Sequence, residues 1–374
     1  MKKLTFDKKD FLKIGEQPLS GTFFVNWIKI LIENKFNIDW RYLPKALYVT
    51  IMILIMTPFR IFEKNSFDKI KNDIKVKSPI FIIGHWRSGT TFLHYLMGQD
   101  KNLAYVSTFE TMTPNMMIKN EELFKNIVKN HLPNKRPMDN LELHADLPYE
   151  EEYAIANLSP YSFYHAWYFP KKMRKYFDQN VLYKNNSNGI KEKWIETYDY
   201  FLKKITYKNN GNQIVLKSLV NTAKIPIILK KYPNAKFIFM YRNPYKVYLS
   251  TWKLYRKILP IFSFQKLNNY QLDNEILYNY RNLITKYLKD KKFIPHGNLI
   301  EISYEDFVKN PFEMLKRIYI KLGLDSFEKS KTAFEKYILK HKNYKTNNYT
   351  IDNKIKDKIY NEWNFAFKEF GYIK

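Results

Sequence analysis

The sequence predicts an α/β fold in which a central parallel sheet is flanked by helices. The first observation is an apolar, β-branched run at 80–83, followed by a short polar turn and by helical spacing from Thr90 onward. The second is a pair of apolar runs, 213–217 and 236–241, that enclose a helical segment at about 222–232. Strand, helix and strand in this order are typical of two parallel strands joined by a crossover.

Three of the expected strand ends carry a glycine or a cation. Gly84, Lys217 and Arg242 each follow an apolar run directly or close it. Ligands of open α/β sheets gather at the carboxyl ends of the strands. We therefore expect these three residues to border one shared site.

The composition indicates a globular chain with enough apolar residues for a core. The chain has 374 residues, of which 45% are hydrophobic and 17% aromatic, so one large domain or two ordinary ones would fit. Cysteine is absent, which excludes disulfides and thiolate catalysis and fits a reducing compartment. The first residues lack the apolar core of a signal peptide, so a cytoplasmic location is expected.

The formal net charge of +27 has two readings. It comes mainly from lysine spread over the whole chain, whereas nucleic-acid readers favour clustered arginine, so no nucleic-acid partner is expected. The first reading is a solvated basic surface without further meaning. The second is attraction for anionic substrates or for the anionic face of a membrane.

The N-terminal segment 1–77 is rich in apolar and aromatic residues. One block covers 23–32, and a second covers 46–56 between Lys45 and Arg60. The eleven residues of the second block are fewer than the roughly 20 that span a bilayer. The segment therefore reads either as buried core helices or as a helical pair that lies in a membrane interface or roofs an apolar acceptor site.

The turn after the first strand has the spacing of a phosphate-binding loop. Gly84 and Gly89 are followed by Thr90 and Thr91, and backbone N–H groups at such a helix start can face a phosphate. An NTPase carries lysine where this chain has Thr90, whereas here the cation lies inside the turn as Arg87. A sulfuryl group carries less charge than a phosphoryl group, so fixed donors and one or two cations would suffice without a metal. A well-capped helix start is the alternative reading.

A second candidate anion site follows the strand at 236–241. Arg242 ends this strand, Pro244 suits the first turn of a helix, and Ser250 lies two turns along. The Arg242 guanidinium can hold an oxyanion with two hydrogen bonds, to which the Ser250 hydroxyl adds one donor. Taken alone, this pattern also fits an ordinary helix N-terminus.

The region between the two motifs gives weaker expectations. A second strand is expected over 103–110, and Asp146 or Pro148 is expected to open a helix whose first turn contains 150–152. Carboxylates at that end of a helix favour its dipole. The aromatic run 160–170 reads as a pocket wall or as core.

Both motifs resemble one known family. The loop RSGTT at 87–91 resembles the 5′-phosphosulfate loop of sulfotransferases that use 3′-phosphoadenosine 5′-phosphosulfate (PAPS). Arg-x-Pro-x₅-Ser at 242–250 resembles their 3′-phosphate site, with Asn243 where many relatives have Asp. The segment 215–239 resembles the one that these enzymes carry before their 3′-phosphate strand, and 302–324 resembles their late strand and helix. The C-terminal segments 341–350 and 363–372 resemble the tail of the large bacterial branch of this superfamily. The resemblance thus covers about residues 78–372.

The resemblance implies a P-loop-like sulfotransferase fold over 78–374, with 1–77 as an extra helical segment. It implies PAPS as the donor, released as adenosine 3′,5′-bisphosphate, and no metal. The donor-binding residues that it implies are Arg87, Ser88, Gly89, Thr90, Thr91, Arg242, Ser250 and Tyr304, the last near the adenine.

The implied reaction is in-line attack of an acceptor hydroxyl on sulfur, with Arg87 stabilising the leaving charge. Such a reaction needs a general base. In tyrosylprotein-type relatives a Glu-Thr pair a little over twenty residues beyond the loop arginine fills this role, and Glu110-Thr111 lie at nearly that distance. Other candidates for the catalytic machinery are His144, His165, the cluster 150–152, and Lys217 as an added charge near the transferred group.

The apolar segments favour a lipophilic alcohol or phenol, such as a sterol, steroid or lipid, as the acceptor. A carbohydrate acceptor is the alternative, because sugars also stack on aromatics. A P-loop kinase would need lysine after Gly89 and an acidic metal ligand at a neighbouring strand end, and the sequence supplies neither. A non-catalytic basic membrane-binding protein would explain the charge but not two phosphate motifs. The oligomeric state is not readable from the sequence.

Overall fold

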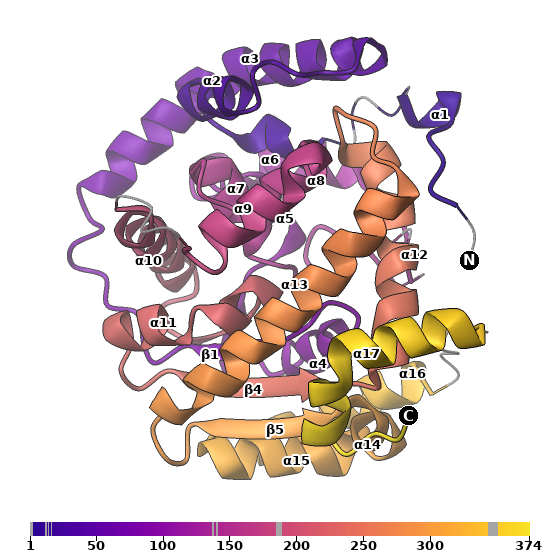
Figure 1. Ribbon diagram of the computed structural model, residues 1–374. Helices are drawn as coiled ribbons and strands as arrows, with labels where there is room; N and C mark the ends of the chain where they lie inside the picture. The colour runs from indigo at the N-terminus through magenta and orange to yellow at the C-terminus, as the bar shows by residue number, and fades with distance from the viewer. Residues whose placement is uncertain are drawn as a thin grey trace.

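The computed structural model describes residues 3–11, 13, 15, 17–136, 138, 139, 141–184, 189–342 and 351–374. Its centre is a five-stranded sheet in the order β2-β3-β1-β4-β5, and every pair of neighbours is parallel (Figure 1). The strands are β1 (Ile80–Gly84), β2 (Leu103–Tyr105), β3 (Gln213–Lys217), β4 (Lys236–Tyr241) and β5 (Leu299–Ser303). The predicted fold class, a parallel sheet flanked by helices with a helical N-terminal segment, is confirmed.

Alternate side chains of β1 and β4 enter two separate cores, one on each face of the sheet. Phe81 and Phe239 belong to the larger core and Ile82 and Ile238 to the smaller one. The larger core is covered by α10 (Ile190–Lys208), α11 (Ile225–Lys231), α12 (Pro244–Phe262), α13 (Asn269–Asp290) and α17 (Asn353–Glu369). The smaller core is covered by α4 (Thr90–Met97), α14 (Tyr304–Lys309), α15 (Pro311–Leu322) and α16 (Phe327–Lys340).

Most of the remaining helices lie above β1, β4 and β5 in the view of Figure 1. The α-helices are α1 (Lys8–Phe11), α2 (Phe24–Glu33), α3 (Leu43–Asp68), α5 (Thr108–Met112), α6 (Glu121–His131), α7 (Glu152–Leu158), α8 (His165–Tyr168) and α9 (Met173–Asn180). The 3-10 helices are η1 (Pro18–Gly21), η2 (Trp40–Tyr42), η3 (Pro170–Lys172), η4 (Leu219–Ala223) and η5 (Lys291–Phe293).

The predicted strand at 103–110 is wrong beyond Tyr105. Ser107 instead caps α5, because its side chain accepts the N–H of Glu110 while the Glu110 carboxylate accepts the N–H of Ser107. This reciprocal pair is a capping box, which satisfies two backbone donors that a helix start would otherwise leave unpaired. Glu110 therefore lies in a helix and not at a strand end.

The helix predicted to open at Asp146 or Pro148 begins only at Glu152. Residues 147–149 run beside the chain after β2, where Tyr149 donates its N–H to the carbonyl oxygen of Val106 and Thr108 donates to that of Leu147. These long-range hydrogen bonds keep the backbone out of the helix. Glu150 and Glu151 precede α7 and turn inward, so neither lies in the first turn of a helix.

The helices α2 and α3 lie side by side along the outer edge of the molecule (Figure 1). Their inward side chains, among them Trp27, Ile30, Val49 and Ile53, belong to the larger core. Within the described residues, 40–68 form the one helix long and apolar enough to cross a membrane by length and composition. That helix continues well beyond the eleven-residue apolar run at 46–56.

Buried charges hold α3 to the body of the protein. The Glu63 carboxylate pairs with Lys204 of α10 at 2.5 Å and accepts the N–H groups of Met117, Ile118 and Lys119. The Lys204 ammonium also donates to the carbonyl oxygen of Pro114 at 2.6 Å. A buried ion pair with all its partners in place is tolerated, whereas the loss of one partner leaves an uncompensated charge.

We expect Lys204→Met to lower the free energy of unfolding by about 3–5 kcal/mol, because Glu63 would keep its charge without a counterion. The measurement is urea unfolding followed by circular dichroism. The matched control is Lys203→Met on the same helix, where the ammonium lies 3.7 Å from Asp199 nearer the surface and the expected loss is below about 1 kcal/mol. Equal losses in the two variants would contradict the structural role of the buried pair.

Candidate active site

The loop between β1 and α4 passes unusually close to β4. A Cβ atom at Gly84 would lie 2.3 Å from the carbonyl oxygen of Met240, and Gly84 has a φ of +142°. Its N–H donates to the Thr222 hydroxyl at 2.8 Å. Only glycine permits this approach and this backbone conformation together. The loop therefore starts directly beside the end of β4.

Arg87 of this loop and Arg242, which follows β4, contact each other. The Arg242 guanidinium donates from Nη1 to the carbonyl oxygen of Arg87 at 3.1 Å, and its Cζ lies 4.1 Å from the centre of the Tyr304 ring. The Arg87 Nε donates to the Ser250 hydroxyl of α12 at 2.9 Å. Four residues from distant parts of the chain thus lie within direct contact of one another.

These residues line a cavity of about 540 Å³, here named the loop cavity. Its lining includes seven of the eight residues predicted to bind the donor, namely Arg87, Gly89, Thr90, Thr91, Arg242, Ser250 and Tyr304. Ser88 is buried behind the loop and is not part of this lining. His341 and Lys342 of the predicted C-terminal segment 341–350 also line the cavity, whereas 343–350 lie outside the described residues.

Several donors around the loop cavity lack a partner. The Arg242 Nε is buried without a hydrogen bond. Within the described part of the chain, the backbone N–H groups of Gly89, Thr90 and Thr91 also have no acceptor. The N–H groups at the start of α4 carry the positive end of the helix dipole. The cavity is therefore suited to an anion.

Arg136 and Asp139 belong to the same network, although the sequence analysis did not single them out. Asp139 pairs with Arg87 at 2.8 Å and with Arg136 at 3.3 Å, and Arg136 donates to the Thr91 hydroxyl at 3.1 Å. Burial raises the pKa of the Asp139 carboxyl, but Arg136 and Arg87 outweigh it and hold that pKa below its usual range. Opposite charges three positions apart are common on protein surfaces, so no local signal marked this pair.

A small cavity of about 30 Å³, here named the junction, adjoins the loop cavity and shares Arg87, Thr90 and Thr91 with it. On its other side it shares Arg136, Met138 and Tyr149 with an apolar cavity of about 420 Å³. The three cavities are therefore arranged in series, with the junction between a cationic space and an apolar one.

The apolar cavity is walled mainly by hydrophobic side chains from the N-terminal segment and from α5, α6 and α12. They include Tyr48, Met52, Met56, Met112, Ile127, Val128, Ile258, Ile261 and Phe262. A cavity with this lining suits an apolar molecule, for which a few polar groups at one end fix the orientation.

Glu150 is the carboxylate that lines the junction. Its two oxygens contact the Lys217 ammonium and the Tyr164 hydroxyl. Burial lowers the pKa of Lys217, and the neighbouring Glu150 opposes this shift. Lys217 was predicted to lie near the transferred group, and its ammonium contacts the junction residue Glu150.

Glu151 has a different environment from Glu150. It accepts hydrogen bonds from the Tyr198 hydroxyl at 2.6 Å, from the Asn221 amide at 2.9 Å and from the N–H of Lys217 at 3.1 Å. Burial raises the pKa of Glu151 to about 7, against the hydrogen bond from Tyr198. Through these hydrogen bonds Glu151 connects α10, β3 and η4 to one another.

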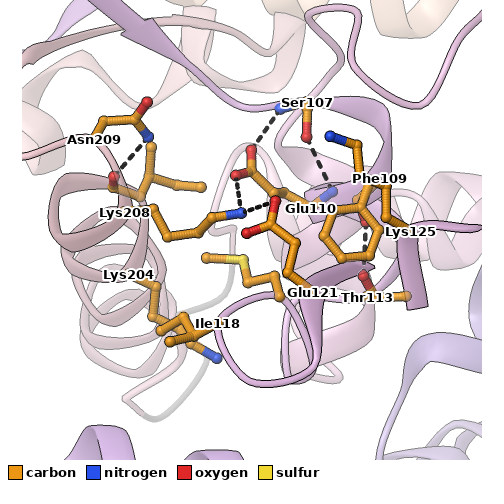
Figure 2. A network of polar contacts seen from close by, with 12 residues as sticks. Ser107, Phe109, Glu110, Thr113, Ile118, Glu121, Lys125, Lys204, Lys208 and Asn209 are labelled. Carbon is orange, nitrogen blue, oxygen red and sulfur yellow. Dashed lines mark hydrogen bonds and ion pairs between the residues drawn. The ribbon is translucent and has the colours of Figure 1, made fainter. Parts of the chain in front are cut away.

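Glu110 lies in a separate polar network (Figure 2). One oxygen accepts the N–H of Ser107 at 2.8 Å, and the other contacts the Lys208 ammonium at 2.9 Å. Lys208 also pairs with Glu121 at 2.9 Å. Glu110 is absent from the lining of the three cavities described above.

The two predicted histidines also lie outside these linings. The exposed His144 is 3.3 Å from Asp146. His165 is buried, with its ring nitrogens 3.1 Å from the carbonyl oxygen of Pro160 and 3.0 Å from that of Ala156. Of the aromatic run 160–170, Trp167 lines the junction, and Phe163, Tyr164, Tyr168 and Phe169 are buried in the core.

A model of the sulfotransferase family matches residues 79–329, which include the loop, both arginines and Tyr304. The chain belongs to the sulfotransferase family. It is 27% identical over 353 residues to the omega-hydroxy-beta-dihydromenaquinone-9 sulfotransferase Stf3 of Mycobacterium bovis, a match that covers 94% of this chain and 90% of the relative. The Stf3 protein of Mycobacterium tuberculosis matches with the same identity and coverage.

Two solved structures of sulfotransferases share the fold. Sulfotransferase STF9 from Mycobacterium avium has a TM-score of 0.68 at 15% identity and covers 94% of this chain and 97% of its own. Sulfotransferase STF1 from Mycobacterium tuberculosis H37Rv has a TM-score of 0.67 at 14% identity, with coverage of 96% and 93%. The predicted family, fold and enzyme class, a sulfotransferase, are confirmed.

His85, in the loop between β1 and α4, makes the stability of the protein sensitive to acid. Burial lowers the pKa of His85 to about 4, against the opposing contact with the carbonyl oxygen of Trp86. The unfolded chain binds this proton near pH 6.5 and the folded chain only near pH 4, so the free energy of unfolding falls as the pH drops through this window. The contribution of His85 amounts to about 1 kcal/mol between about pH 7 and about pH 5.5.

We expect His85→Gln to reduce the acid-induced loss of stability by about 1 kcal/mol, as measured by urea unfolding at these two pH values. The matched control is His296→Gln, which changes an exposed histidine. An unchanged pH dependence in His85→Gln would show that this imidazole binds its proton in the folded protein.

Proposed function

We propose that this sulfotransferase moves a sulfuryl group from PAPS to a hydroxyl group of a lipophilic acceptor. The observation that carries the proposal is the meeting of Arg87 and Arg242 in one cavity at neighbouring strand ends. The nucleotide donor bears anionic groups at both its 5′ and 3′ ends, so it needs two separated anion-binding groups on one surface. A buried Arg242 Nε without a partner supports the fit of a further anion there.

Each end of the donor would have its own set of donors. Arg87 and the N–H groups of Gly89, Thr90 and Thr91 would hold the 5′-phosphosulfate and stabilise the charge that develops on the bridging oxygen. Arg242 and Ser250 would hold the 3′-phosphate, and the Tyr304 ring beside Arg242 would border the adenine.

Asn243 replaces the aspartate of many relatives. Its side chain accepts hydrogen bonds from the N–H groups of Tyr245 and Lys246 and so caps α12. Unlike an aspartate, this cap adds no negative charge beside the proposed 3′-phosphate site.

The serial cavities support a lipophilic alcohol as the acceptor. An acceptor tail in the apolar cavity would present its hydroxyl at the junction, beside Arg87. The Stf3 relative is named as the sulfotransferase of an omega-hydroxylated dihydromenaquinone, a lipid with a hydroxyl group. We propose that the N-terminal segment 1–77 forms the roof of this site, because it contributes Tyr48, Met52 and Met56 to the lining. In this proposal residues 78–374 form the catalytic domain, and the protein is located in the cytoplasm.

Glu150 is the general base that we propose. It is the carboxylate at the junction, where it would take the proton of the acceptor hydroxyl as the oxygen bonds to sulfur and the nucleotide oxygen leaves. Lys217 and Tyr164 hold the Glu150 carboxylate in position. Glu110, the first candidate from the sequence, is absent from the linings of the loop cavity, the junction and the apolar cavity.

The binding of adenosine 3′,5′-bisphosphate tests the donor site. We expect calorimetry to show a single site in the wild-type protein and a roughly 10- to 100-fold weaker affinity in Arg242→Lys, because lysine offers no paired donors. The matched control is Arg281→Lys, which alters an exposed arginine of α13 that pairs with Glu362 of α17. Equal affinity in both variants, or no binding by the wild type, would overturn the proposed donor.

Turnover of a hydroxyl-bearing lipid tests the base. We expect Glu150→Gln to lower kcat by about 10²- to 10⁴-fold at unchanged nucleotide affinity. The comparison variant Glu110→Gln is expected to retain turnover but to lose stability, because it weakens the capping box of α5. The opposite pattern would return the role to Glu110.

A further inference from the structure

One side of α3 leaves a row of large apolar side chains in contact with solvent. Leu43, Leu47, Ile51, Leu54, Ile55 and Phe59 follow one another mostly at spacings of three or four residues, and between 42% and 61% of each is exposed. This spacing places them on one face of the helix. Phe24, Val25 and Ile32 extend the exposed apolar surface onto α2. We call this surface, formed by the exposed residues of 24–62, the outer face.

The outer face is cationic wherever it is not apolar. Every exposed residue from 24 to 62 is apolar or basic except Asn37, and the basic ones are Lys29, Lys35 and Arg41. Both carboxylates near it are only half exposed or less. Glu33 pairs with Lys175, and Asp39 accepts the N–H of Arg41. Apolar side chains bordered by lysine and arginine, with an exposed tryptophan at 40, are typical of helices that lie in the interface of an anionic bilayer.

The inner side of α3 shows that the helix lies along the protein rather than apart from it. The Lys45 ammonium donates to the carbonyl oxygen of Ile261 at 2.7 Å, and the Arg60 guanidinium donates to that of Ser20 at 2.6 Å. Glu63 adds its buried pair with Lys204. A helix that crossed the bilayer alone would bring these three charged groups into hydrocarbon without their partners. The contacts therefore favour a helix in the plane of the membrane.

The apolar cavity lies beside the outer face. Tyr48, Met52 and Met56 line the cavity, and each is adjacent in sequence to an exposed apolar residue of the outer face. On α6, Ile127 lines the same cavity and is itself partly exposed. The outer face and the wall of the apolar cavity are therefore neighbouring sides of one helix, α3.

We propose that the outer face of α2 and α3 docks on an anionic lipid bilayer, with α3 lying in the interface and the apolar cavity facing the membrane. The docking needs no catalytic step. The entry of the acceptor from the bilayer into the cavity rests in addition on the proposed function. A second copy of this chain fits the outer face less well, because a two-fold pair would bring Lys29, Lys35 and Arg41 against the same cations.

Vesicle binding of the full-length protein tests the docking without donor or acceptor. We expect cosedimentation with vesicles of equal parts phosphatidylcholine and phosphatidylglycerol, much weaker binding to pure phosphatidylcholine, and release by salt. The double variant Leu54→Glu/Ile55→Glu should lose about tenfold or more in partition coefficient, because two apolar anchors become anionic. The matched control is Ile320→Glu/Ile373→Glu, which makes the same charge change at exposed positions outside the outer face and should retain most of the binding.

Circular dichroism confirms that each variant is folded, and the spectra should be equal in the variants and the wild type. Absence of vesicle binding by the wild type, or equal losses in the two double variants, would overturn the proposal. A wild-type dimer that Leu54→Glu/Ile55→Glu dissociates, without vesicle binding, would assign the outer face to a second copy. Resistance of vesicle-bound protein to salt and to alkaline carbonate would show that α3 crosses the bilayer and would also overturn the in-plane docking.

If the docking and the proposed function both hold, the same double variant should slow sulfation of a vesicle-embedded lipid alcohol by about tenfold, in line with its loss of partitioning. Turnover of a short-chain soluble alcohol should not change. Normal nucleotide binding and vesicle binding without any sulfation would instead reject the proposed function and leave the docking in place.

Discussion

The parallel register of β1 with β4 places Gly84 opposite Met240, and at that point the two backbones approach so closely that no side chain fits between them. The loop that follows Gly84 consequently turns directly beside the end of β4. Because of this proximity the Arg242 guanidinium can donate to the carbonyl oxygen of Arg87 at 3.1 Å. Every other feature of the loop cavity, from the contact of Arg87 with Ser250 to the Tyr304 ring against Arg242, depends on that juxtaposition.

The loop cavity concentrates positive charge before any ligand enters it. Arg87, Arg136 and Arg242 are all largely buried, and Asp139 is shared between the first two. Fixed cations in a partly desolvated space interact more strongly with an anion than they would in water, and they need no reorganisation when charge develops. Asp139 occupies one Arg87 donor, so an incoming anion competes with a carboxylate of the chain itself.

Polarity changes sharply along the three cavities. The loop cavity is cationic and the apolar cavity is hydrophobic, and Glu150 with its Lys217 partner lies at the junction between them. Under the proposed function, such an order would separate the charged part of the donor from the apolar part of the acceptor and bring only their reacting groups together. The helix α3 forms two different surfaces: part of the wall of the apolar cavity on one side, and the outer face on another. The buried contacts of Lys45, Arg60 and Glu63 fix the orientation of α3 on the protein, so the two surfaces keep constant positions relative to each other.

Local sequence patterns sufficed for β1, β3 and β4 and for the two motifs that follow β1 and β4. Apolar runs ended by glycine or arginine specify strands and their ends over a few residues, so Gly84, Arg87, Arg242 and Ser250 could be placed from neighbours in the chain. The capping box from Ser107 to Glu110 was also local, but the β-branched and aromatic residues around it resembled a strand and hid it.

Other features of the site depended on contacts between residues far apart in sequence. The inward turn of Glu150 requires the hydrogen bonds that hold 147–149 beside β2, and the pairing of Arg87 with Asp139 spans 52 positions. The apolar cavity forms only where α3, α6 and α12 come together. The sequence by itself therefore determined the strands β1, β3 and β4 and the turns at their ends, because an apolar run and the glycine, arginine or proline that ends it act within a few residues. The tertiary structure decided which carboxylate reaches the junction and where the apolar cavity opens, because both follow from the packing of distant segments.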